Sequence, residues 1–286
     1  MAEAVVVSMA RVHLEWGSPE QTPPIAVNDR LALVPDLSVI IITKNEVENV
    51  SAALKSVAWA NERLVVDSGS TDDTVSIARR YADRVVSHAW EGYGAQKNFA
   101  TRLAANDWVL SIDADERVPQ SLAEEIQDLM RTGPSKDGYR IPRMTRYLGR
   151  WIRSTDWYPD PQLRLYDRRV SCWSASPAHE SVTVDGSVGL LRSALHHHAY
   201  RDLSHHLDTI DRYTTLVANQ MFVDGRRAGW TDLFVRPQLT FLRNYVIRLG
   251  VRDGYPGLIV SLLNSYYVLL KYAKLWEQQR SKGSDH

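Results

Sequence analysis

A short apolar run ends in two aspartates separated by one residue, within residues 108–116. The run is typical of a buried strand that presents carboxylates at its carboxyl edge, where open α/β sheets bind ligands. Side chains alternate along a strand, so Asp113 and Asp115 share a face if the strand geometry continues. Two hard oxygen ligands at this spacing suit Mg²⁺ or Mn²⁺. A solvated turn is the simpler alternative for such a pair taken alone.

Two earlier segments show the same order of strand and polar residues. Leu37–Thr43 is rich in β-branched residues and too short for a helix, and residues 63–67 form a second short strand before a glycine turn. Helical spacing follows at 48–60, at 74–81 and near 95–105, with a third strand at 84–87. This alternation predicts an α/β fold with a mostly parallel sheet and helices on both faces.

Four strings in this region resemble the nucleotide-sugar domain of family-2 inverting glycosyltransferases. They are SVIIITKNE, VVDSGSTDDT, GYGAQKNFA and WVLSIDADE, and their order and spacing match as well. Later strings are similar to the bacterial subgroup that adds glucose to the inner-core heptose of lipopolysaccharide: WYPDPQLRLYDRR, PAHESVTVDG, HHAYRDL and DGYPGLIVSLLNSYYVLLKYAKLWE. The resemblance covers roughly residues 37–277 and implies a GT-A-like, Rossmann-like catalytic domain.

The resemblance implies a nucleotide pocket at the ends of the first two strands. Asp67 corresponds to a residue that accepts a hydrogen bond from the uracil ring, and Thr43, Asn45 and Glu46 would line the pocket beside it. Shaping the turn and capping the next helix is the alternative for Asp67. Lys97 opens a predicted helix near the same edge, and it either contacts the nucleotide or is a solvated lysine.

The metal and the diphosphate are assigned to a second group of residues. Asp115 is expected to coordinate Mg²⁺ or Mn²⁺, with Asp113 on the ribose or in the outer shell of the metal. Alignment by the following Tyr-Arg favours His197 as a third ligand, although a run of three histidines also suits a loop or a core. Arg164 and Arg168 would bind the diphosphate through their guanidinium groups, and salt bridging is the alternative.

A base for the acceptor hydroxyl is expected across the sugar from the diphosphate. Glu180 occupies the place where the resembling enzymes carry an acidic catalytic residue, and Asp160 is the second candidate. A carboxylate near diphosphate and metal charge is ionised at neutral pH, as a base must be.

Composition limits the classes of function. The 286 residues suffice for one large α/β domain with an appendage, and the 34 basic and 34 acidic residues argue against a nucleic-acid partner. A lone cysteine, Cys172, excludes an internal disulfide, fits a reducing compartment and is expected to be packed in a short strand at 170–173. The proline-rich stretch 1–36 lacks the pattern of a signal peptide and is predicted to be a loose extension.

The C-terminal part differs in character. We assign 37–200 to the catalytic domain and 201–286 to a helical region. The apolar run 258–270 is shorter than a membrane-spanning helix requires, and it follows a helical stretch with one apolar side and several arginines. This mixture suits a helix lying in a membrane interface. The alternatives are a helical hairpin packed on the catalytic domain and a dimer surface.

Together these features predict a metal-dependent inverting hexosyltransferase on the cytoplasmic face of the membrane, bound peripherally. Its donor would be a UDP-sugar, with glucose expected, and its acceptor a lipid-linked saccharide such as the lipopolysaccharide inner core. Transfer to polyprenyl phosphate or another surface glycan is one alternative, and a non-catalytic sugar-nucleotide-binding scaffold is another. A nucleotidyltransferase would need a glycine-rich opening loop that the sequence lacks. The sequence leaves the oligomeric state open.

Overall fold

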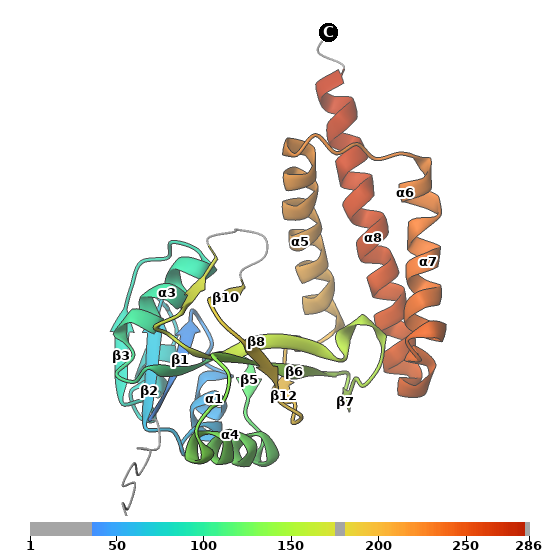
Figure 1. Ribbon diagram of the computed structural model, residues 1–286. Coiled ribbons are helices and arrows are strands. Elements are labelled where there is room, and N and C mark those ends of the chain that lie inside the picture. The colour runs from blue at the N-terminus through green and yellow to red at the C-terminus, as the bar shows by residue number, and fades with distance from the viewer. Residues whose placement is uncertain (1–35, 175–180, 284–286) are drawn as a thin grey trace, which may run out of the picture. The chain divides into compact units, whose positions relative to one another are not determined.

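The computed structural model describes residues 36–174 and 181–283, which belong to one compact unit. The first strands and helices alternate along the chain (Figure 1). They are β1 (Leu37–Thr43), α1 (Val50–Ser56), β2 (Glu62–Asp67), α2 (Thr74–Ala78), β3 (Arg84–Ser87), α3 (Tyr93–Leu103) and β4 (Trp108–Asp113). β1 pairs in parallel with β2 and β4, and β2 pairs in parallel with β3. The predicted order of strands and helices is confirmed over this region.

The second half of the sheet brings in antiparallel strands. Its elements are β5 (Glu116–Arg117), α4 (Gln120–Thr132), β6 (Gly138–Tyr147), β7 (Arg150–Trp151), η1 (Thr155–Trp157), β8 (Asp160–Asp167), β11 (Val188–Leu190) and β12 (Leu195–His197). The strand order is β3-β2-β1-β4-β8-β6-β12-β5, with β8 antiparallel to β4 and β6. The sheet is therefore mixed: β1 to β4 form a parallel part, and β6 also pairs in parallel with β11 and β12.

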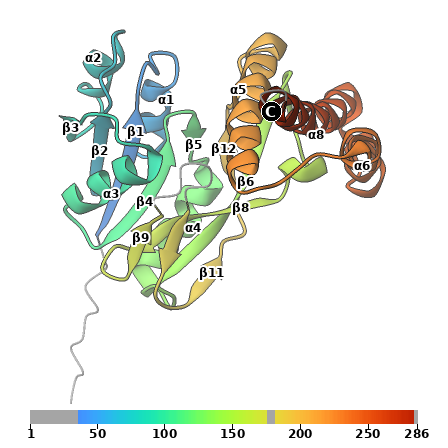
Figure 2. The same ribbon diagram turned by 90° about the horizontal axis from the view of Figure 1, so that it is seen from above.

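Alternation along β1 explains why helices cover both faces of the sheet. Leu37, Val39 and Ile41 pack in one apolar cluster with residues of α1 and α4, whereas Ile40 and Ile42 pack in a second cluster with residues of α3. Because successive side chains point to opposite faces, a strand covered on both sides must be apolar throughout. Figure 2 shows the sheet between these helices. The burial of every residue in β1 follows from this arrangement.

A small hairpin, β9 (Ser171–Trp173) and β10 (Val182–Val184), pairs apart from the main sheet. Trp173 is buried, but Cys172 is exposed. The expectation that Cys172 is packed was wrong, because neighbouring residues of a strand face opposite sides and Trp173 takes the inner position.

The last part of the described chain is helical. It comprises α5 (Leu203–Val223), α6 (Trp230–Phe234), α7 (Arg236–Leu242), the π-helical turn η2 (Arg243–Ile247), η3 (Gly250–Asp253) and α8 (Gly254–Gly283). α8 packs against both α5 and α7 (Figure 1). Among the described residues, we find no helix with the length and apolar character needed to cross a bilayer.

Candidate functional site

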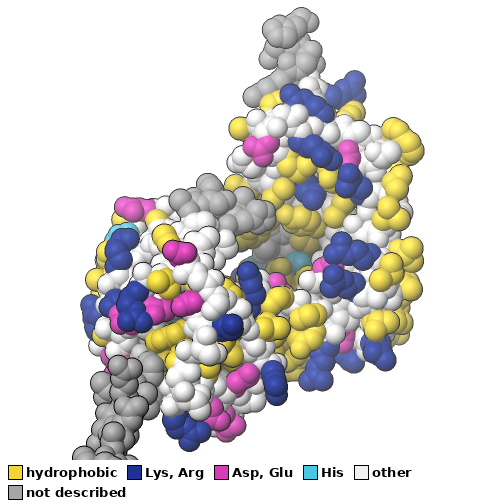
Figure 3. All heavy atoms as spheres, in the orientation of Figure 1, with side chains coloured by type: hydrophobic (Ala, Val, Ile, Leu, Met, Phe, Trp, Pro, Cys, Tyr) yellow, Lys and Arg dark blue, Asp and Glu magenta, His cyan; other side chains and the backbone are white. Residues whose placement is uncertain are grey.

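A cleft of about 1240 Å³ opens where β1 and β4 end. One wall is formed by the residues that follow these strands, and the other by β12, α5 and α8. Figure 3 shows the hollow, with a histidine side chain at its bottom. Strands that run in parallel end at one edge, so polar residues from distant parts of the sequence meet there. The cleft therefore lies at the edge of the sheet where the sequence places the nucleotide.

Asp113 ends β4 and contacts two cations. Its Oδ1 lies 3.0 Å from Lys97 Nζ and its Oδ2 accepts a 2.6 Å hydrogen bond from Arg164 Nη2. Burial raises the pKa of Asp113, but the charges of Arg164 and Lys97 outweigh burial and hold that pKa well below its usual range. Lys97 is only 2% exposed, so the solvated alternative for this residue is excluded.

Glu116 is a buried carboxylate that the sequence analysis did not single out. It is 0% exposed; its Oε1 accepts from Arg164 Nη2 at 2.8 Å and its Oε2 accepts from the Asp113 N–H at 2.9 Å. Glu116 therefore fixes both the backbone and the cationic partner of Asp113. The sequence feature that could have identified Glu116 is an acid directly after the Asp-x-Asp pair, at a position where the end of the strand directs the side chain into the protein interior.

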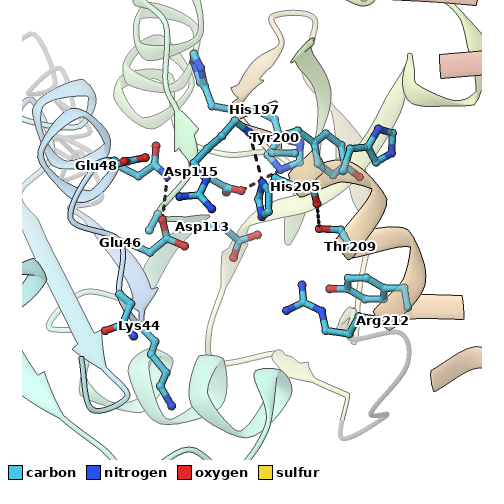
Figure 4. A pocket seen from close by; sticks show the side chains of 18 of the residues that line it. Lys44, Glu46, Glu48, Asp113, Asp115, His197, Tyr200, His205, Thr209 and Arg212 are labelled. Carbon is cyan, nitrogen blue, oxygen red and sulfur yellow. Dashed lines mark hydrogen bonds and ion pairs between the residues drawn. The ribbon is translucent and has the colours of Figure 1, made fainter. Parts of the chain in front are cut away.

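Asp115 lies in the turn between β4 and β5, and its partner is His197. The two side chains point toward one another, with His197 Nε2 at 3.3 Å from Asp115 Oδ2 (Figure 4). Burial raises the pKa of Asp115, and the hydrogen bond from His197 lowers it to a net value below the usual range. Because β4 ends at Asp113, the strand geometry does not continue to Asp115. The condition for a common strand face is therefore not met; both aspartates line the cleft, and they have different partners.

The pairing of β12 with β5 and β6 selects His197 from the run of three histidines. His197 faces Glu116 across the β12–β5 pair and Thr145 across the β12–β6 pair. Thr145 Oγ1 lies 3.1 Å from His197 Nδ1, which orients Nε2 toward Asp115. His196 and His198 instead pack against Trp151, with ring centroids 4.0 and 5.5 Å away.

The first two strands end in a hydrogen-bonded turn. Asp67 accepts hydrogen bonds from the N–H groups of Gly69 and Ser70, each at 2.9 Å. Asn45 Oδ1 accepts from the Thr71 N–H at 2.8 Å, and this bond ties the end of β1 to the segment after β2. These contacts are those expected of a turn-shaping Asp67.

Two further predicted residues, Thr43 and Glu46, line the cleft itself. Thr43 is 5% exposed, and its Oγ1 has no hydrogen-bond partner among the described residues. A buried hydroxyl left without a hydrogen-bond partner is costly. Burial raises the pKa of Glu46, and the hydrogen bond from Asn49 opposes that shift.

Several described residues of the predicted set do not line the cleft itself: Asp67, Lys97, Asp160, Arg164 and Arg168. Arg168 follows β8, whose Asp167 pairs with Trp108 at the opposite end of β4, and its Nε lies 3.5 Å from Asp107 Oδ1. Asp160 lies beside the cleft but is ion-paired with Arg143, with Nη2 at 2.6 Å from Oδ2. Glu180 falls in 175–180, outside the described residues.

The opposite wall of the cleft comes from α5, which the sequence analysis did not connect with the site. His205, Thr209, Arg212 and Tyr213 line the cleft. Their spacing of four, seven and eight residues places them on one side of a helix. This polar face was detectable as a periodic pattern, but nothing local indicated which partner it faces.

Comparisons with known proteins agree with this geometry. The family model described as glycosyl transferase family 2 matches residues 38–197. A lipopolysaccharide core biosynthesis glycosyltransferase, LpsC, of Rhizobium meliloti is 30% identical over 255 residues, covering 86% of this chain and 94% of the relative. An uncharacterised glycosyltransferase of Rickettsia typhi is also 30% identical, over 84% of this chain and 87% of its own length.

Among solved structures, a mannosyltransferase of Pyrobaculum calidifontis in complex with GDP-Man and Mn²⁺ is similar in fold. Its TM-score is 0.51 at 15% identity, with 84% of this chain and 87% of that chain covered. The two curated relatives cover most of both chains, and the family model spans every strand from β1 to β12. The chain therefore belongs to glycosyl transferase family 2 and has the GT-A fold.

Proposed function

We propose that this glycosyltransferase moves a sugar, glucose in the first instance, from a UDP-sugar to a lipid-linked glycan with inversion at the anomeric carbon. The motifs that resemble the inner-core subgroup support the donor and the inversion. The similarity to a relative named for lipopolysaccharide core biosynthesis supports the acceptor class. The observation that carries the proposal is the edge of the sheet itself, where Asp113 and the Asp115–His197 pair line one cleft.

The donor set at this edge fits a divalent cation. The described residues contain no group of three or more His, Cys, Asp or Glu side chains arranged to hold a metal. Asp115 and His197 supply one carboxylate and one imidazole, a set that suits Mn²⁺ better than Mg²⁺ and leaves positions for ligand oxygens. Asp113 is already paired with two cations, so it is less suited to metal binding. A bound cation would neutralise charge on the departing diphosphate.

The buried charges around Asp113 give this residue a fixed orientation. Lys97 and Arg164 hold its two oxygens, and both cations are buried. We assign Asp113 to the ribose or to the outer shell of the cation, and Lys97 and Arg164 to positioning it. Arg164 then acts on the donor through Asp113 rather than by direct contact with the diphosphate. Asp67, Asn45 and Glu46 remain our candidates for the nucleotide side of the cleft.

The base remains assigned to Glu180. Asp160 is less suited, because its carboxylate already accepts hydrogen bonds from both Nε and Nη2 of Arg143. Glu180 would take the proton of the acceptor hydroxyl as that oxygen attacks the anomeric carbon.

An apolar surface on the helical part supports docking to lipid. Its residues lie on α6, α7 and η2 and are at least 49% exposed: Trp230, Phe234, Leu239, Leu242, Val246 and Ile247. Figure 3 shows hydrophobic side chains and arginines together along this edge of the molecule. We propose that this apolar surface lies in the interface of an anionic membrane, on the cytoplasmic side, because aromatic and apolar residues beside cations favour that position. A lipid-linked acceptor would then be presented near the cleft.

A donor screen tests the proposed reaction. The full chain is incubated with UDP-, GDP- and dTDP-sugars, with and without Mn²⁺, and with lipopolysaccharide lacking the outer core as acceptor. We expect transfer from UDP-glucose with Mn²⁺, and a β-linked product by NMR. An α-linked product would contradict inversion, and transfer only to polyprenyl phosphate would move the acceptor to the alternative class. Binding of UDP without any transfer would indicate the non-catalytic scaffold.

A further inference from the structure

The α5 wall of the cleft carries a cation, Arg212, that no described carboxylate neutralises. Arg212 lines the cleft and is exposed, and its guanidinium carbon lies 5.5 Å from the centroid of the Tyr213 ring. It makes no ion pair with any carboxylate that the structure describes. The neighbouring acid, Asp211, instead pairs with Lys274 Nζ at 2.7 Å on the side of α8. This distance between Arg212 and Tyr213 lies within the range of a cation–π contact.

Arg201, just before α5, lines the same wall and also has no carboxylate partner among the described residues. Two other arginines at this site are paired with carboxylates. Arg143 is paired with Asp160, and Arg164 is paired with Asp113 and Glu116. The cleft therefore has arginines that hold its own carboxylates in place, and arginines on the α5 wall that no carboxylate in 36–174 or 181–283 neutralises.

The position of Arg212 and Arg201 in the cleft indicates which substrate they face. Figure 4 shows Arg212 on the helix across the open space from Lys44 and Asp113, which lie at the strand ends. If the strand ends hold the nucleotide and diphosphate, α5 lies on the side from which an acceptor approaches. In a single displacement the acceptor attacks opposite the leaving group, so donor and acceptor occupy different walls. Tyr213 and Tyr267 also line this part of the cleft and offer aromatic faces to a sugar.

We propose that Arg212, assisted by Arg201, binds an anionic group, a phosphate or a carboxylate, on the acceptor saccharide. This inference rests on the proposed glycosyl transfer and adds the chemical class of its acceptor: a negatively charged glycan. A guanidinium binds such oxyanions bidentately, which fixes orientation as well as adding affinity. Arg212 is thus a specificity-determining residue that acts on the acceptor and leaves the donor unaffected.

The test separates acceptor from donor. Initial rates are measured with UDP-glucose and two acceptors: core oligosaccharide freed of lipid, and the same material after removal of phosphate and reduction of carboxylates. Arg212→Gln is expected to raise KM for the native acceptor by about tenfold to a hundredfold, as for loss of a charge-assisted hydrogen bond. KM for UDP-glucose stays within about twofold, and Arg212→Lys falls between Gln and wild type.

The neutralised acceptor provides a second arm. For wild type, replacing the native acceptor by the neutralised one should raise KM by about as much as Arg212→Gln raises KM for the native acceptor. For Arg212→Gln, neutralising the acceptor should raise KM little further. Arg79→Gln, an exposed arginine at the end of α2, is the matched control and should leave both KM values unchanged. UDP binding by calorimetry should be equal in all variants.

Two results would overturn this assignment. A rise in KM for UDP-glucose, or weaker UDP binding, in Arg212→Gln would place the arginine on the donor diphosphate. Equal use of native and neutralised acceptor by the wild type would show that no anion is recognised. Both differ from failure of the proposed function itself, in which the wild type would neither bind UDP nor transfer sugar.

Discussion

Asp113 and Asp115 are two positions apart, yet they contact different neighbours. Asp113 is held between Lys97 and Arg164, and Asp115 faces His197. The turn after β4 separates them, and the pairing of β12 with β5 brings the histidine to the second aspartate. At the scale of single residues, the motif is therefore divided into a positioned carboxylate and a candidate metal ligand.

Replacing Asp115 tests the second role. Asp115→Asn should reduce transfer to below about a tenth of wild type, since loss of a metal ligand removes several kcal/mol of transition-state stabilisation. Its melting temperature should match that of wild type, and calorimetry with UDP should show weaker Mn²⁺ binding. Asp128→Asn is the control, because Asp128 is exposed on α4 and pairs only with Arg131 among the described ion pairs. Full activity in Asp115→Asn would remove this residue from the site.

Replacing Glu180 tests the base. Glu180→Gln should lower kcat by roughly 10²–10⁴, with KM for the UDP-sugar nearly unchanged, as expected when only proton transfer is impaired. Asp160→Asn should have a smaller effect, because Arg143 already stabilises that carboxylate. If donor binding collapses in Glu180→Gln while Asp160→Asn abolishes turnover, the two assignments must be exchanged.

At the scale of elements, α5 is anchored to the sheet by an aromatic cluster. His206 is buried, its Nδ1 lies 2.8 Å from the Tyr147 hydroxyl, and its ring lies 4.0 Å from that of Tyr200. Trp157 stacks on Tyr200 with ring centroids 5.5 Å apart. The cluster sets the position of α5, and α5 supplies one wall of the cleft.

Burial of His206 makes this contact sensitive to acid. Burial, and secondarily the nearby His205, lowers the pKa of His206 to about 4 from an ordinary value of 6.5. Between these values the unfolded chain binds the proton more readily, so the free energy of unfolding falls as pH drops from 6.5 to 4, by at most about 3 kcal/mol. Above pH 6.5 His206 is largely neutral in both the folded and the unfolded chain, so this loss of stability is absent.

Urea unfolding at several pH values measures the effect. Wild type should lose stability over that interval more steeply than His206→Gln, and His205→Gln, a change at the neighbouring position on α5, should keep most of the wild-type slope. Parallel profiles for wild type and His206→Gln would show that His206 is not the titrating group.

At the scale of the whole molecule, the exposed apolar surface on α6, α7 and η2 would be stabilised by burial against a partner. Several cations near it are already paired: Arg236 with Asp232, and Arg243 and Arg248 with Asp156. Apolar contact should therefore contribute more to lipid binding than charge does, and high salt should weaken binding only in part.

Flotation with anionic vesicles tests this docking. Phe234→Asp combined with Ile247→Asp should reduce the bound fraction at least about tenfold, because each side chain loses one to three kcal/mol of burial. Leu190→Asp, on β11, is the control, since Leu190 is 64% exposed on the sheet. If wild type never floats and light scattering shows a dimer that the double variant dissociates, the surface is an interface between copies.

The sequence by itself determined the order of strands and helices and the edge of the sheet where polar residues gather. Those features are local: runs of β-branched residues, helical spacing and turn residues act over a few positions. It also favoured His197, by alignment of the following Tyr-Arg, and the register of β12 against β5 and β6 pairs that histidine with Glu116 and Thr145. The roles of Asp67 and Asp113 depended on which groups donate hydrogen bonds to their carboxylate oxygens, and the sequence left those alternatives open.

Only the tertiary structure decided which charges meet. Arg164 lies in β8 and Arg168 just after it, four residues on, but one reaches Asp113 and the other the opposite edge of the sheet. Glu116 became a buried anchor because the strand end turns it inward, and Arg212 reached the cleft because α5 folds back across it. Such contacts join residues about fifty to a hundred positions apart. Their energies depend on packing and burial that no local pattern encodes.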